Sequence, residues 1–84
     1  MEPDVVQVKV LPSLALQVEF ADGTAGTVQF KESHLTGVFK TLLDPEFFKL
    51  VHIQGGVVTW PGELDLAPDA MYQAIKSQGQ WVLS

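Results

Sequence analysis

The sequence predicts an α+β protein: a three-stranded meander, a helix, a β-hairpin and a C-terminal helix in one small antiparallel-sheet domain. Apolar and polar residues alternate up to residue 30, and apolar residues then recur at helical spacing over 35–43. A Gly-Gly pair at 55–56 separates two more apolar stretches, which is typical of a hairpin. With 84 residues, 46% hydrophobic and 18% charged, the chain has enough apolar surface for one core, so we expect a single domain over 1–84.

The alternation predicts three half-buried strands, at residues 6–10, 14–20 and 27–30. Directly opposed residues in an antiparallel pair share a face of the sheet, so each turn can be tested by the pairs it creates. For the first turn this test favours a three-residue loop, Leu11-Pro12-Ser13. That loop pairs Val10 with Leu14, apolar against apolar.

The second turn is tested in the same way. A two-residue loop would oppose Val18 to Thr27, an apolar residue to a polar one. A three-residue loop over 21–23 instead places Val18 on the same face as Val28. This loop requires a residue with positive φ at its last position, which is Gly23.

The next stretch carries one apolar stripe at helical spacing, formed by Leu35, Val38, Phe39, Leu42 and Leu43. It predicts a helix, although Gly37 weakens the first turn and both Ser33 and Thr36 are able to cap it. Asp44 and Pro45 then have the form of an N-cap and a first helical residue, which predicts a short second helical turn.

The glycine pair predicts a two-residue hairpin loop in which Ile53 meets Val58 and His52 meets Thr59 on the other face. Trp60 then shares the face of Ile53, so we expect it in the core.

The stretch from Thr59 to Tyr72 is the candidate site. It holds three carboxylates and no basic residue, and Pro68 with Asp69 has the form of a helix start. Asp69 lies where its carboxylate interacts favourably with the positive end of the helix dipole. Glu63 and Asp65, in contrast, are left without a local partner. The binding residues we expect are Trp60, Glu63, Asp65, Asp69, Tyr72 and Trp81.

Residues 77–84 form an apolar C-terminal tail that contains Trp81-Val82-Leu83. Soluble proteins avoid exposed apolar segments, so the tail should be covered. It either adds to an edge of its own sheet or crosses to a second copy and forms a homodimer. Of these two arrangements we favour the homodimer.

The composition excludes several classes of protein. Without cysteine there is no disulfide, thiolate metal site or thiol nucleophile. Five single lysines, no arginine and a net charge of −5 argue against direct nucleic-acid binding. No apolar run is long enough for a membrane span, so we expect a cytoplasmic protein. His34 and His52 fit surface positions, and Ser33-His34 is no catalytic pair, so we expect no catalytic residue, metal site or cofactor.

Three blocks, LQVEFADGTAGTVQF, HLTGVFKTLLDPEFFKLV and GGVVTWPGELDLAPDAMY, resemble a small bacterial family known as domain of unknown function 2442. The resemblance covers about residues 5–72. It implies a small α+β fold, gives no established activity, and suggests an antitoxin-like role beside another small protein. Family members often carry a polar residue before the glycine after Trp60-Pro61 and a serine where this chain has Ala67, so the departures weaken the acidic turn as a chemical site.

We therefore expect a non-enzymatic protein-binding or regulatory module with an unidentified protein partner. The alternative is an accessory protein that binds a small molecule or a divalent metal through the acidic turn after Trp60. Calorimetric titration with divalent ions and common metabolites separates the two. A saturable signal that Asp65→Ala abolishes favours the alternative.

Overall fold

The computed structural model describes residues 4–62 and 64–83, except for the side chains of His34 and Val38. Glu63 therefore lies outside the described residues. The elements, in chain order, are β1 (Val5–Leu11), β2 (Ala15–Phe20), β3 (Ala25–Phe30), η1 (Glu32–His34), η2 (Gly37–Leu43), α1 (Pro45–Phe48), β4 (His52–Gln54), β5 (Val57–Trp60), β6 (Leu64–Asp65), α2 (Pro68–Gln78) and β7 (Gln80–Leu83).

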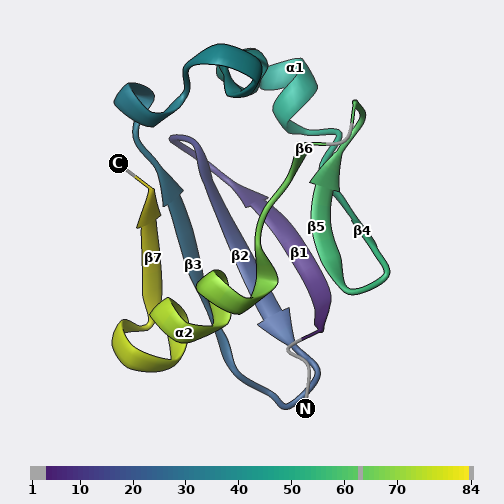
Figure 1. Ribbon diagram of the computed structural model, residues 1–84, viewed down its shortest axis with the longest axis vertical. Coiled ribbons are helices and arrows are strands. Elements are labelled where there is room, and N and C mark those ends of the chain that lie inside the picture. Colours follow the sequence, from purple (N-terminus) through teal and green to yellow (C-terminus); the bar gives the residue numbers. More distant parts are fainter. Residues whose placement is uncertain (1–3, 63, 84) are drawn as a thin grey trace.

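The strands form two sheets that are mostly antiparallel, and together with the helices they confirm the α+β class that the sequence predicts. One sheet has the order β1-β2-β3-β7 and the other β4-β5-β6. β7 runs parallel to β3, and the remaining pairs are antiparallel. Figure 1 shows α2 crossing one face of the four-stranded sheet, with the smaller sheet beside β1. The backbone N–H of Val5 donates to the carbonyl of Gly56 (2.9 Å), which links the two sheets.

The predicted register of β2 against β3 is confirmed. Leu16 lies opposite Val28, and Val18 lies opposite Gly26. Gly23 has a φ of 91°, as the three-residue loop requires. The glycine at this position therefore fixes which residues of the hairpin face the core.

The predicted register of β1 against β2 is wrong by two residues. Val10 lies opposite Leu16, not Leu14, and the turn is formed by residues 12–14. Ser13 and Leu14 both have positive φ, at 64° and 58°. A shift of two residues leaves every side chain on the same face, so alternation alone does not distinguish the two registers.

The start of β1 also differs from the expectation. A bulge between Val5 and Gln7 moves Val5 into the core, where it is 2% exposed, and turns Val6 out to 56% exposure. Val10 is 36% exposed because it lies on an edge strand. Val8 is partly buried, so the alternating pattern that predicts a half-buried strand at residues 6–10 holds only in part.

The helix predicted over 35–43 is replaced by the 3₁₀ segment η2 alone, and a second 3₁₀ segment, η1, lies just before this stretch. Thr36 is extended and Gly37 has a φ of 59°, so an α-helix cannot run through them. Leu35 and Leu42 are nevertheless buried. The Asp44 cap is confirmed, because its carboxylate accepts from the N–H of Glu46 (3.0 Å).

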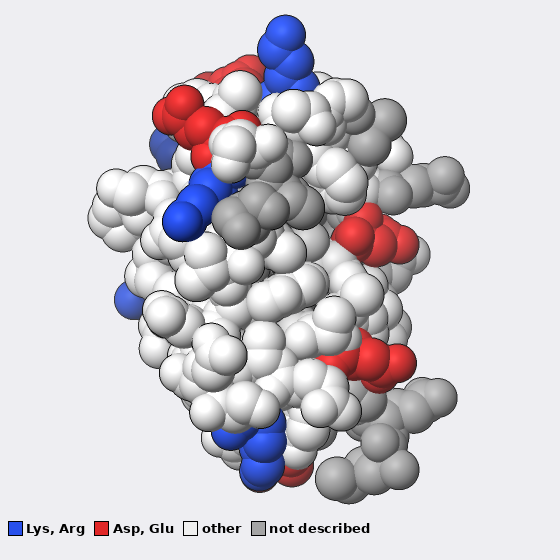
Figure 2. Space-filling model, turned by 60° about the vertical axis from the view of Figure 1, so that its left-hand side comes forward, with Lys and Arg blue, Asp and Glu red and all other residues white. Residues whose placement is uncertain are grey.

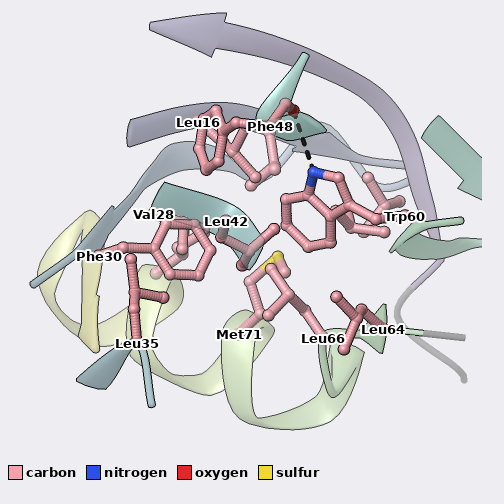
Figure 3. Close-up of a cluster of buried hydrophobic side chains, with 14 of the residues drawn as sticks. Leu16, Val28, Phe30, Leu35, Leu42, Phe48, Trp60, Leu64, Leu66 and Met71 are labelled. Atoms are coloured by element: carbon pink, nitrogen blue, oxygen red, sulfur yellow. Dashed lines mark hydrogen bonds between the residues drawn. The ribbon is translucent and has the colours of Figure 1, made fainter. Parts of the chain in front are cut away.

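The Gly55-Gly56 hairpin has the predicted register, with Ile53 opposite Val58. Trp60 is 1% exposed, so its predicted burial is confirmed. Its indole N–H donates to the carbonyl of Phe48 (3.0 Å), as drawn in Figure 3. Its ring also packs against Phe30 of the other sheet, with 6.0 Å between ring centroids. Trp60 thus joins both sheets and α1 in one core.

The four-stranded sheet has a packed inner face and an open outer face. The inner face carries Leu16, Val18 and Phe20 of β2, all at most 1% exposed. α2 packs on this face so closely that a Cβ on Gly26 would lie 2.5 Å from the carbonyl oxygen of Gly79. The side chains between the buried ones therefore point to the opposite face.

The C-terminal tail adds to its own sheet as β7, with Trp81 beside Val28. In this structure the tail therefore has the first of the two expected arrangements, pairing with its own sheet, rather than the crossed tail that we favoured. The physical reason is the turn at Gly79: its φ of 77° ends α2 and directs the chain back along β3. Whether the protein associates with itself stays a prediction. Within residues 4–62 and 64–83 no helix is both long and apolar enough to cross a membrane.

Candidate functional site

Asp65 has a structural partner that the sequence did not reveal. In the ladder of β5 and β6, Thr59 lies opposite Asp65, and the Thr59 hydroxyl has the Asp65 carboxylate as its nearest acceptor. Thr59 is 5% exposed, and a buried hydroxyl without a partner is costly. Asp65 therefore satisfies a buried group, which corrects the expectation that it had no local partner.

The other carboxylates of the acidic turn do not converge with it. Asp69 is exposed in the first turn of α2, where Pro68 is the first helical residue and Ala67 makes no capping side-chain bond. Glu63 lies outside the described residues. In the part of the chain that the structure covers, no group of three or more histidine or acidic residues is placed to hold a metal ion.

Tyr72 fastens α2 to the turn between β2 and β3. Its hydroxyl donates to Asp22 (2.5 Å), and its ring stands edge-on to Phe20 with 5.1 Å between centroids. The bond from Tyr72, followed by bonds from Thr24, lowers the pKa of Asp22 from 3.8 to about 2. Lys76 lies 5.9 Å from the Tyr72 ring and lowers this pKa a little further.

The two tryptophans are not surface anchors of one site. Trp60 is in the core, and Trp81, beside buried Val28, is half-buried on the inner face of the sheet and packed against that core. His52 is exposed, with its Nδ1 3.1 Å from the carbonyl oxygen of Leu50. The residues expected to form one binding site are thus distributed over the core, β6, α2 and β7.

The surface that the fold leaves open is the outer face of the four-stranded sheet. Its side chains come from the positions between the buried ones, and most are exposed and uncharged. α2 lies on the inner face, and no described element packs across the outer one. The outer face is lined by Gln7, Lys9, Gln17, Glu19, Ala25, Thr27, Gln80 and Val82.

A hollow of about 210 Å³ opens on this face, over β1, β2 and the start of β3. Lys9 lies opposite Gln17 and Glu19 lies opposite Gln7, so the two charged residues are diagonal neighbours. Neither has an ion-pair partner among the residues that the structure describes. The hollow thus offers one positive charge, one negative charge and two amides to a binding partner.

Sequence reasoning missed these residues because it assigned the polar half of each alternation to solvent. The signal present in the sequence is the recurrence of glutamine at outward positions of three strands, Gln7, Gln17 and Gln80. An amide side chain has both donors and an acceptor, so it suits a surface that binds polar groups.

A comparison with protein families gives one finding for this chain. The model of the family described as "Protein of unknown function (DUF2442)" matches residues 5–77. No curated protein and no solved structure matches.

Proposed function

The chain belongs to the DUF2442 family of proteins of unknown function, and on that premise we propose that it is a non-enzymatic protein-binding module. The partner docks on the outer face of the four-stranded sheet. The observation that supports this is the one-sided packing of that sheet: β2 buries Leu16, Val18 and Phe20 on one face and exposes Gln17 and Glu19 on the other.

The side chains of the outer face indicate the kind of partner surface that would bind there. Glutamine amides and a threonine hydroxyl suit a polar, mostly uncharged surface, since each offers a donor and an acceptor. Lys9 and Glu19 line the hollow and have no ion-pair partner within the described part of the chain, so they suit a partner that places one acidic and one basic group opposite them. An antitoxin-like role beside another small protein is the form of this proposal that the family resemblance suggests.

The same proposal places the protein in the cytoplasm and gives it no role in binding nucleic acid. Nucleic-acid surfaces depend on clustered lysine and arginine. This chain has five lysines, no arginine and a net charge of −5. Its charge therefore suits a protein partner better than a phosphate backbone.

The proposal is tested by photo-crosslinking in the source cells. A crosslinking amino acid replaces Gln17, at the centre of the outer face, and in a matched control it replaces Gln73, which is exposed on α2. We expect a defined adduct with one protein from position 17 and none from position 73. The same adduct from both positions, or an adduct from position 73 alone, contradicts docking on the outer face.

A second candidate function is the binding of a small zwitterion, such as a free amino acid or a dipeptide, in the hollow. The hollow holds Lys9 and Glu19 at diagonal positions, beside two glutamine amides. These two charges match a ligand with one carboxylate and one ammonium group. Calorimetric titration with amino acids tests it: a saturable signal that Lys9→Gln removes supports this function. The acidic turn is a weaker ligand site, because Asp65 already accepts from Thr59. Titration of the wild type and of the Asp65→Asn variant with divalent ions tests that alternative.

A further inference from the structure

Among the described residues no strand pairs with β7 on the side away from β3, so β7 forms one edge of the four-stranded sheet. The carbonyl of Leu83 accepts from the N–H of Lys31 (2.9 Å), and the carbonyl of Gly79 also accepts from β3. Backbone N–H and C=O groups of successive strand residues point to opposite sides. The N–H and C=O of Gln80 and Val82 therefore point away from β3, toward the open edge.

The other edges of the two sheets carry features that hinder pairing with a strand of another chain, and the β7 edge lacks them. β1 carries Lys9 and a bulge, β4 carries His52, and β6 carries Asp65. β7 has the sequence QWVL, with no charge and no proline, and it pairs with β3 without a register shift. In Figure 2 the β7 side of the molecule is turned forward, and it shows a broad uncharged surface, with basic and acidic side chains toward its upper and lower ends and acidic side chains along its right-hand margin.

We propose that β7 pairs with β7 of a second copy, antiparallel and about a two-fold axis next to Val82. The two Val82 residues then exchange both backbone hydrogen bonds, N–H to C=O, and join the two sheets into one of eight strands. Val82, 39% exposed on the outer face, packs against its own symmetry mate. Trp81 of each copy lies opposite Leu83 of the other, apolar against apolar.

A second copy is the occupant that this strand suits best. With the axis at Val82, each uncharged side chain of the edge meets another uncharged side chain. The net charge of −5 lies on other elements, since β7 has none of it. The pairing is independent of the proposed partner, although it would join the outer faces of two copies into one continuous surface.

The strand is short, so the association should be weak. Because β7 has only four residues, we expect its pairing to bury less than the roughly 1,200 Å² of a typical stable interface. We therefore expect a dissociation constant between about 1 μM and 1 mM. Light scattering over this concentration range should show the mass rising from one chain to two. A chain that stays monomeric throughout the range overturns the proposal.

Charge variants test the position of the axis. Val82→Lys places two ammonium groups against each other, so the dimer should be lost, and Val82→Glu should act in the same way. An equimolar mixture of the two variants should restore association, because lysine then faces glutamate. The matched control is Val6→Lys, at a valine of β1 that is 56% exposed, which should leave the dimer unchanged. No recovery in the mixture, or equal loss in the control, refutes pairing at Val82.

A proline variant tests the backbone bonds. Val82→Pro removes an N–H that points to the open edge and so costs β7 no bond to β3. We expect a folded monomer, with the circular dichroism spectrum of the wild type and at least a tenfold weaker association. Val82→Pro that dimerises like the wild type would show that the edge does not pair through this residue. If this variant fails to fold, the lysine and glutamate mixture decides the question.

Discussion

Asp22 sits in the turn between β2 and β3, where its carboxylate accepts from the Tyr72 hydroxyl and from the backbone N–H of Thr24. Both bonds favour the ionised form, which is why the pKa falls from 3.8 to about 2. Tyr72→Phe removes the larger cause. We therefore expect the pKa of Asp22 to rise toward 3.8 in this variant, as measured by NMR titration of the carboxyl carbon. An unchanged pKa would mean that Tyr72 does not hold Asp22 in solution.

The sign of the pH dependence follows from the direction of this shift. A carboxylate whose pKa is lower in the folded state contributes to the free energy of unfolding above its unfolded pKa. For Asp22 the contribution is lost as the pH falls from about 3.8 through about 2. The melting temperatures of wild type and Tyr72→Phe should therefore differ more at pH 6 than at pH 2.

At the scale of elements, α2 packs on β3 at Gly26. A Cβ there would lie 2.5 Å from the Gly79 carbonyl oxygen and 2.6 Å from Cγ2 of Ile75. Gly26→Ala should therefore lower the free energy of unfolding by about 1 to 3 kcal/mol, as overpacking does. Urea denaturation measures this loss. The control Ala25→Ser, at the exposed neighbour, should stay within about 0.5 kcal/mol of wild type, and an equally stable Gly26→Ala would contradict the close approach.

The turns show how far the sequence can predict these elements. Glycine adopts positive φ readily, so Gly23 and the Gly55-Gly56 pair can be recognised in the sequence as turn residues. The registers of the two hairpins that they close were therefore predicted correctly. The turn at 12–14 places Ser13 and Leu14 at positive φ, which their residue types disfavour. A tertiary contact supports it: the side-chain amide of Gln29 donates to the carbonyl of Ser13 (2.8 Å). That contact comes from β3 and has no local signal.

The candidate site was also hard to predict, because its contacts join residues that are distant in the sequence and leave no local signal. Asp65 appeared free because its partner, Thr59, lies across a ladder whose register depends on the whole second sheet. Which half of each strand stays exposed depends on the face that α2 covers. Alternation predicted two faces for the first sheet, but it did not predict that the glutamine face would be left open.

At the scale of the whole molecule, Trp60 connects the parts. It contacts Phe30 of one sheet and Phe48 of α1, with centroid separations of 6.0 and 5.9 Å. Trp60→Ala should cost about 3 to 5 kcal/mol, a large share of the roughly 5 to 15 kcal/mol that stabilises a typical domain. Thermal denaturation should show the loss. The half-exposed Trp81 offers the matched control, and Trp81→Ala should cost less. Equal losses would contradict a core centred on Trp60.

The central claim is that a protein partner binds the outer face of the four-stranded sheet. Its most direct test is a calorimetric titration with the protein captured at position 17, using two charge reversals. Glu19 lies on the outer face and Asp69 is exposed on α2, and replacing either carboxylate with lysine changes the net charge of −5 by the same two units, to −3. We predict that Glu19→Lys weakens binding at least tenfold, about 1.4 kcal/mol, and that Asp69→Lys leaves the affinity unchanged. The reverse result, with Asp69→Lys weakening binding and Glu19→Lys having no effect, would contradict the claim.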